Sequence, residues 1–189
     1  DNFYVDYHLG IDDTHMRMFM PAGKGRTVYQ LNSLFNHRYY EPSLRTLPVP
    51  ALLVRQKSEA WDHPFIAVYE PYGNGEKAQI HSVYTGKTSK QKGVAKLSVE
   101  YFKKDKVDHI IHSVNEKTEV KYMGIRFIGT YCVATMEKGR LVSLYIGNGY
   151  SFSMDGLEVS LGEGKPFDAW LEWRDGEWIC HSRESVKVK

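Results

Sequence analysis

Residues 167–178 read FDAWLEWRDGEW, and the order of residue types in this stretch decides the class of fold. Its apolar residues fall at every second position, namely Phe167, Ala169, Leu171 and Trp173. Successive side chains of a strand point to opposite faces, so this alternation predicts a β-strand with one buried face. Asp175-Gly176 follows, and this pair readily adopts the positive φ angles of a tight hairpin. The stretch therefore predicts two antiparallel strands, with Trp173 and Trp178 as a cross-strand pair.

Similar short runs, either alternating or rich in β-branched and aromatic residues, recur along the whole chain. They cover residues 26–31, 51–56, 65–69, 79–84, 94–102, 107–114, 119–122, 125–135, 141–146, 157–161 and 186–189. Several of the breaks between them carry turn residues, among them Lys138-Gly139, Asn148-Gly149 and Asp155-Gly156. No long window shows helical spacing. The sequence therefore predicts an all-β fold, an antiparallel β-sandwich of about a dozen strands with essentially no helix.

The 189 residues are enough for one compact domain, and we expect residues 1–189 to form a single β-sandwich. A polar, Lys-rich stretch at residues 86–93 reads as a loop. The alternative is two halves, 1–86 and 94–189, joined by that loop. The chain opens within a strand-like pattern and without Met, so we expect it to be a piece of a longer polypeptide.

Charge and hydropathy exclude some classes of partner. The formal net charge of +2 argues against a dedicated nucleic-acid binder, which would carry a strong basic excess. No apolar run approaches the roughly 18 residues of a membrane-spanning helix, so we expect no membrane partner. The two cysteines, Cys132 and Cys180, are too few for a structural zinc site, and no cofactor is expected. They are either two free thiols or a disulfide between distant strands.

The N-terminal segment offers a candidate metal site. His8, Asp12, Asp13 and His15 lie on either side of a predicted turn, and two strands joined there would bring both imidazoles together. Histidine and carboxylate groups that converge on one point suit a transition metal. The alternative is a hairpin in which the aspartates build the turn and the histidines only form hydrogen bonds.

Other catalytic patterns fail, so no catalytic residue is predicted. His109 and His112 are an odd number of positions apart, so a regular strand places them on opposite faces and away from one substrate atom, even with Glu116 nearby. No Gly-x-Ser-x-Gly elbow occurs, and neither cysteine has an activating histidine. The two Gly-x-Gly segments lack the Lys-Ser/Thr of a phosphate loop.

Exposed aromatic and basic residues form a candidate carbohydrate site. Flat aromatic rings stack on the apolar faces of sugars, and lysines neutralise uronate or sulfate groups. Residues in predicted loops or on the predicted outer face that suit this role are Trp61, Tyr72, Trp170, Lys90 and Lys92. The alternative is that the rings serve the core and the lysines only solvate a loop.

Several segments resemble the C-terminal β-rich region of heparinase II/III-like polysaccharide lyases. They are FYVD at 3–6, HMRMFMP at 15–21, PALLVRQ at 50–56, EAW at 59–61, PFIAVYEPY at 64–72, GIRFIGTY at 124–131, and residues 139–149. The resemblance implies a parent enzyme with an upstream helical toroid that cleaves acidic polysaccharides by β-elimination. It implies a catalytic Tyr–His pair located mostly upstream and, in some members, a structural metal in the β region. No residue of this chain matches the catalytic set; His15 is nearest to a family histidine and is expected to be structural.

We therefore expect a non-catalytic accessory domain of a larger heparinase II/III-like acidic-polysaccharide lyase, working in the periplasm or outside the cell. Its expected partners are the upstream helical catalytic domain of the same chain and an acidic polysaccharide. The first alternative is a carbohydrate-binding module for acidic glycans. The second alternative is a stand-alone metal-dependent enzyme that uses His8, Asp12 and His15.

Overall fold

The computed structural model describes residues 3–8, 13–34, 48–57, 59, 63–73, 75–86, 91–103, 105–162 and 164–189. Within these residues the chain is all-β, with fifteen strands and no helix, so the predicted antiparallel sandwich is confirmed. The strands are β1 (Phe3–His8), β2 (His15–Met20), β3 (Arg26–Leu34), β4 (Pro48–Gln56), β5 (Val68–Tyr72), β6 (Ile80–Thr85), β7 (Val94–Tyr101), β8 (Lys106–Ser113), β9 (Val120–Tyr122), β10 (Ile125–Glu137), β11 (Arg140–Met154), β12 (Leu157–Ser160), β13 (Phe167–Arg174), β14 (Glu177–His181) and β15 (Lys187–Val188).

A membrane-crossing helix, which would have to be long and apolar, does not occur in the described part of the chain.

The chain divides into two compact units. The smaller one, Gly23–Glu59, contains the β3–β4 hairpin, in which Arg26 lies opposite Gln56. The Arg26 guanidinium donates from Nε and Nη2 to Oε1 of Gln56 at 3.0 and 2.8 Å. The larger unit, Asp1–Ala22 with Ala60–Lys189, contains all the other strands.

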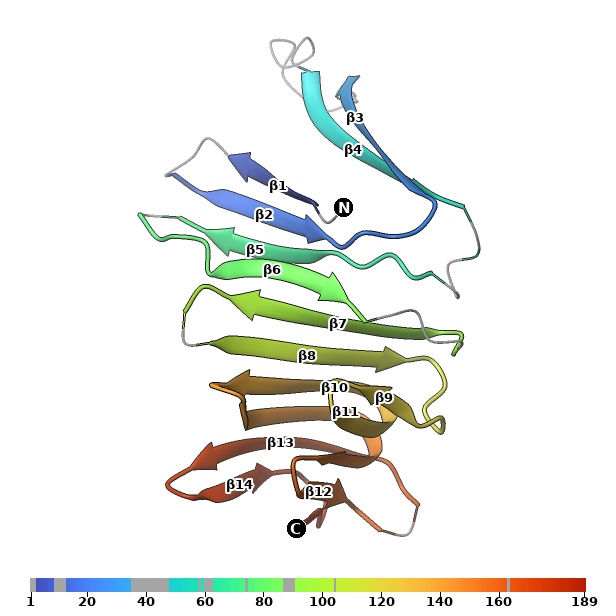
Figure 1. Ribbon diagram of the computed structural model, residues 1–189, viewed down its shortest axis with the longest axis vertical. Helices are drawn as coiled ribbons and strands as arrows, with labels where there is room; N and C mark the ends of the chain where they lie inside the picture. Colours follow the sequence, from blue (N-terminus) through green and yellow to red (C-terminus); the bar gives the residue numbers. More distant parts are fainter. Residues whose placement is uncertain are drawn as a thin grey trace. The chain divides into compact units, whose positions relative to one another are not determined.

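The larger unit is built from a short sheet and a long sheet. The short one has the order β1-β2-β5, and the long one runs β14-β13-β11-β10-β8-β7-β6 with all neighbours antiparallel. Figure 1 shows that neighbours in the long sheet largely follow one another along the chain. The predicted loop at residues 86–93 joins β6 and β7, which pair with each other. The division into halves at this loop stays a prediction.

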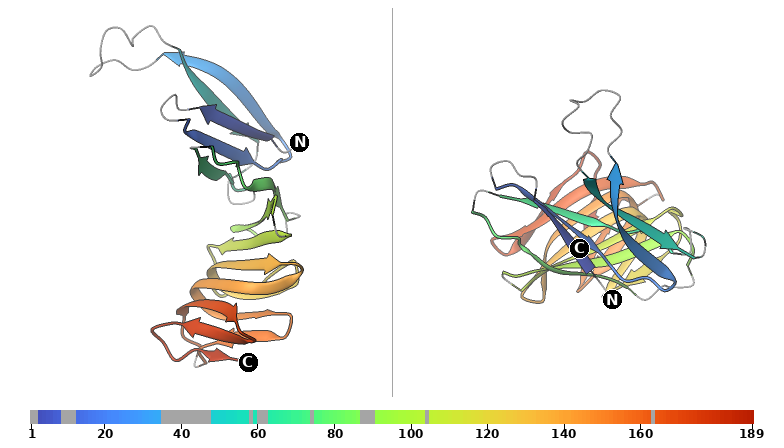
Figure 2. Two further views of the ribbon diagram at one scale, coloured as in Figure 1. Left: turned by 90° about the vertical axis from the view of Figure 1, so that its left-hand side faces the viewer. Right: turned by 90° about the horizontal axis from the view of Figure 1, so that it is seen from above.

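Two long strands fold the long sheet over on itself. The first part of β10 pairs with β9 and its second part with β8, while β11 pairs first with β13 and then with β12. The register shifts at Ile128/Gly129 and again between Ile146 and Gly149, and both strands bend there. The result is two layers, β8-β10-β11-β13-β14 and β9-β10-β11-β12-β15, which can be followed in the left view of Figure 2.

The predicted break at Asn148-Gly149 is wrong. Asn148 does adopt a positive φ of 49°, but β11 continues through it to Met154. The unusual backbone conformation serves a bulge that bends the strand rather than a turn that ends it. The predicted Asp175-Gly176 hairpin is confirmed, with φ of 53° and 92°.

The space between the two layers holds the main hydrophobic core. One layer contributes Ile111, Leu144, Ile146 and Leu171, and the other contributes Val120, Ile125, Phe127, Phe152 and Val159, each at most 1% exposed. Burying one such aliphatic or aromatic side chain contributes about 1.5–3 kcal/mol, so this layer contact is the main source of stability in the unit.

A second, smaller core lies on the opposite face of the long sheet. Phe19 from β2 packs there with Ile80, Val83, Leu97 and Val99 of β6 and β7. This cluster joins the short sheet to the long one. Glu70 of β5 strengthens the junction, because its buried Oε1 accepts hydrogen bonds from the backbone N–H groups of Gln79 and Ile80.

Candidate functional site

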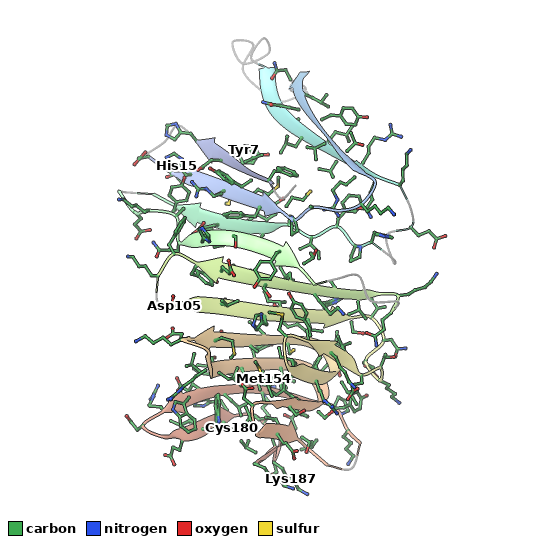
Figure 3. All side chains as sticks on the ribbon, in the orientation of Figure 1. Tyr7, His15, Asp105, Met154, Cys180 and Lys187 are labelled. Atoms are coloured by element: carbon green, nitrogen blue, oxygen red, sulfur yellow. The ribbon has the colours of Figure 1, made fainter. Side chains whose placement is uncertain are left out.

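A polar cluster forms where β1, β2 and β5 lie side by side. The register sets Asp6 opposite Arg17, and it sets His15 between His8 on one neighbouring strand and Tyr72 on the other. The three strands thus bring together acidic, basic and phenolic groups from positions up to 66 residues apart in the sequence. Figure 3 labels His15 at the start of β2.

Asp6 is the centre of the hydrogen bonds in this cluster. Arg17 donates to Asp6 Oδ2 from Nη2 at 2.7 Å and from Nε at 3.1 Å. Tyr72 donates its hydroxyl proton to the same oxygen, and Arg17 Nη2 also lies 3.3 Å from the Tyr72 hydroxyl. The other carboxylate oxygen of Asp6 lies 3.4 Å from Nδ1 of His15. The Arg17 guanidinium and the Tyr72 hydroxyl therefore share one oxygen of this carboxylate, and the His15 ring lies beside the other.

These contacts shift the pKa of Tyr72 in the direction that opposes a role as general base. The bond to Asp6, together with burial, raises the pKa of the Tyr72 phenol, and the charge of Arg17 only partly offsets this. Partial burial acts to raise the pKa of Asp6, but the bonds from Tyr72 and Arg17 outweigh it and hold that pKa below its ordinary value. A tyrosine that acts as a general base needs a lowered pKa near the working pH. The cluster is therefore built as a clamp between strands.

The predicted metal ligands do converge. His8 and His15 stack with ring centroids 4.7 Å apart, and the ligand atoms of His8, Asp13 and His15 all lie within 4.8 Å of one another. Two imidazoles and a carboxylate are a donor set that zinc accepts, with a fourth position for water. However, the two ring nitrogens of His15 already face carboxylates, Asp6 at 3.4 Å and Asp13 at 3.3 Å. Asp12 lies outside the described residues, and a metal at this position stays a prediction.

A hollow of about 1,010 Å³ lies beside the clamp. Its lining includes Arg17 and Tyr72 of the clamp together with Phe102 and Lys103. Tyr72 was predicted to stack on a sugar, but one face of its ring is occupied by His15 at 4.8 Å and its hydroxyl is bonded to Asp6. Because of these contacts, less of the Tyr72 ring is open for stacking on a sugar than the sequence predicted.

Those of the other predicted carbohydrate-binding residues that the structure describes, Lys92 and Trp170, do not line this hollow. Trp61 and Lys90 lie outside the described residues. Lys92 is exposed beside β7, and Trp170 is exposed on β13 of the long sheet, whereas Tyr72 belongs to the short sheet. Trp170 and Tyr72 therefore lie on different sheets. A single carbohydrate site made of all five predicted residues stays a prediction.

His109 and His112 lie on opposite faces of β8, as the odd spacing indicates. His112 is exposed, whereas His109 is buried and its Nδ1 lies 2.7 Å from the Ser98 hydroxyl. The same hydroxyl lies 2.7 Å from the Tyr122 hydroxyl, and burial lowers the pKa of His109. Ser98 is fully buried, so this network holds β7, β8 and β9 together and reaches no substrate.

A further network was not expected from the sequence. Asn148 donates through Nδ2 to Glu116 and to Thr130, both at 2.8 Å, and Tyr150 donates to Glu116 at 2.9 Å. The bonds from Asn148 and Tyr150 lower the pKa of Glu116. Glu116 therefore fastens the loop after β8 to the bend of β11. A signal was present, since Asn is one of the residues that tolerate positive φ, but its partners are distant in sequence.

Both cysteines are free. Cys132 is fully buried in the main core, and burial raises the pKa of its thiol to about 12. Cys180, labelled in Figure 3, is half-buried on β14 and its thiol pKa is also raised by burial. A thiol that stays protonated is a poor nucleophile, so both cysteines act as core residues.

Comparison with known proteins gives two matches. Residues 79–172 match the family model of the endo-acting ulvan lyase C-terminal domain. An endo-acting ulvan lyase from Formosa agariphila is 32% identical over 151 residues. The aligned part is 78% of this chain but only 18% of that enzyme.

The matched residues 79–172 include β6 to β12 and most of β13, which contain both bends of the long sheet and most of the main core. The polysaccharide-lyase part of the sequence-based expectation is thereby confirmed, while the heparinase II/III-like part stays a prediction. The chain therefore contains, over residues 79–172, a domain similar to the C-terminal domain of endo-acting ulvan lyases.

Proposed function

We propose that this chain is a non-catalytic accessory domain of a larger lyase that acts on ulvan or a related acidic polysaccharide. One observation carries this proposal: the Tyr72–Asp6–Arg17 clamp, the part of the described structure with groups most like an elimination site, has its proton already held by a carboxylate. β-Elimination needs a base that is free to take a proton from the sugar ring. The clamp offers a protonated phenol instead.

The size of the relative supports the same proposal. This chain spans 18% of the Formosa enzyme, which leaves most of that enzyme to supply an active site. A catalytic domain in the same polypeptide is therefore the partner we propose. The helical toroid of heparinase II/III-like enzymes is our finer proposal for it, supported by the motifs at residues 3–6, 15–21 and 64–72. We place the parent protein in the periplasm or outside the cell, since polymeric substrates are met there.

An assay of the purified chain tests the proposal. The chain is incubated with ulvan at high concentration, and ultraviolet absorbance of the unsaturated uronate product is followed, with the Formosa enzyme as positive control. We expect no product from the chain alone. Product that disappears in a Tyr72→Phe or His15→Ala variant would show that the clamp is catalytic and would refute the proposal.

A further inference from the structure

The outer face of β11, β13 and β14 carries three aromatic rings in one row. The register sets Tyr145 opposite Trp170, and Trp170 opposite His181. Tyr145 and Trp170 are 47% and 44% exposed, and the rings of Trp170 and His181 stack at 4.9 Å. The residues that alternate with them, such as Leu144 and Leu171, are fully buried. The row is therefore fixed to a rigid layer while its rings face solvent.

The same face of the long sheet is covered by the second core at β7, farther from β14. Leu97 of β7 lies in line with Ile110, Val133 and Tyr145 through successive strand pairs. At Leu97 this face is packed under the second core, whereas at Tyr145 it is exposed. Solvent-facing rings in a row on one face are more than the scattered exposed apolar residues that any protein surface shows.

A hollow of about 540 Å³ lies beside the row. Besides the rings, it is lined by Asp168, Ser182, Arg183 and Glu184. This volume falls within the range of sites that hold small ligands. The combination of large rings with several hydrogen-bonding groups means that a ligand here must have both an apolar surface and hydroxyl or amide groups.

The polar groups of the hollow are held in place. The Ser182 hydroxyl lies 2.6 Å from the backbone oxygen of Asp168 and 2.9 Å from the Glu184 carboxylate. Asp168 accepts a hydrogen bond of 2.7 Å from the backbone N–H of Asn148, at the bend of β11. Groups that are fixed before binding lose little entropy when a ligand arrives. The hollow is thus a preorganised site as well as a depression.

We propose that this hollow binds an uncharged sugar ring of a polysaccharide chain. The C–H face of such a ring would lie against Trp170 or Tyr145, and its hydroxyls would donate to the carboxylates of Asp168 and Glu184. Two carboxylates against the single guanidinium of Arg183 make the lining net negative, so a uronate or sulfate group is repelled. The ligand class is therefore neutral, in contrast to an acidic substrate.

This proposal rests on the proposed function and deepens it, because an accessory domain of a polysaccharide lyase is expected to contact a glycan. Of the residues named in the row and the lining of the hollow, Tyr145, Asp168 and Trp170 lie inside the region that matches ulvan lyase C-terminal domains. A neutral-sugar site on this domain would anchor the enzyme to uncharged parts of its polymer or of a neighbouring polymer, while cleavage takes place elsewhere.

Isothermal titration calorimetry of the full chain tests the proposal with four probes: cellohexaose, xylohexaose, mannohexaose and hexagalacturonate. We expect at least one neutral probe to bind and the acidic probe to bind more weakly. Trp170→Ala should raise the Kd of the neutral probe about tenfold or more, the equivalent of about 1.4 kcal/mol. The matched control is Trp173→Ala, since Trp173 is on the same strand and is 48% exposed but points to the other face.

Glu184→Gln separates the charge argument from the stacking argument. Removing this carboxylate should bring the affinity for hexagalacturonate closer to that for the neutral probe. Tyr145→Ala provides a second stacking variant if Trp170→Ala fails to fold by circular dichroism. The proposal is overturned if no neutral probe binds, if the acidic probe binds more tightly, or if Trp173→Ala weakens binding as much as Trp170→Ala. None of these readouts depends on lyase turnover, so failure here is distinct from failure of the accessory role.

Discussion

Replacing Gly129 by Ala perturbs the bend that folds the long sheet into two layers. An added Cβ would lie 2.5 Å from Cζ of Phe127 and 2.7 Å from Cα of Gly149. The second contact is with backbone, which cannot move aside without separating β10 from β11. The φ of Gly129 is +154°, a conformation that residues with a side chain rarely adopt.

The two effects give the size of the expected loss. Overpacking in a tight interior costs about 1–3 kcal/mol. An unfavourable backbone conformation costs about 1–3 kcal/mol more. We therefore expect Gly129→Ala to lower the free energy of unfolding by about 2–6 kcal/mol. A loss of about 4 kcal/mol, in the middle of this range, lowers Tm by roughly 8–16 °C for a chain of this size.

The assay is urea unfolding followed by tryptophan fluorescence, because Trp170, Trp173 and Trp178 all lie on β13 and β14. Gly147→Ala is the matched control. The nearest heavy atom to its added Cβ is 3.6 Å away, an ordinary contact, and we expect a change within about 0.5 kcal/mol. Equal stability of the two variants would refute the reasoning that close backbone approach at Gly129 fixes the bend.

Three further predictions concern the buried networks. Ser98→Ala leaves the polar atoms of His109 and Tyr122 without their buried partner, so we expect urea unfolding to show a loss of about 1–3 kcal/mol. Because burial lowers the pKa of His109, the unfolded chain takes up this proton more readily, and the free energy of unfolding should fall as the pH drops from about 8 to about 5, less so in His109→Gln. Asn148→Ala should lower Tm more than Asn148→Gly, since both lose the bond to Glu116 but only glycine keeps the positive φ without strain.

The alternation of apolar residues was enough to predict the fold class and several local features. Residues 167–178 form the predicted hairpin, and the rings of Trp173 and Trp178 meet edge to face at 5.4 Å. The pairing of His8 with His15 on neighbouring strands also follows from local sequence. Each of these features depends on neighbours in one hairpin, and the rules of strand and turn chemistry are strongest at that range.

Features that depend on distant pairing could not be predicted. The bend at Asn148 looked like a turn because both structures use the same positive φ, and only the pairing of β11 with two different strands distinguishes them. Tyr72 looked like an exposed aromatic residue because its partner Asp6 is 66 positions away. Whether a ring is exposed or already bonded depends on which distant strand pairs next to it. The alternation of residues within one strand does not reveal that partner.

The acidity of Tyr72 tests most directly whether this chain is scaffold rather than catalyst. The chain is labelled with ¹³C at tyrosine ring carbons, and the Tyr72 signal is assigned by its loss in Tyr72→Phe. Titration then gives the pKa of this phenol, which we expect to lie above the ordinary value of 10.0 because Asp6 holds the proton. A pKa close to neutral would mean that the phenolate is available as a base, and it would contradict the account.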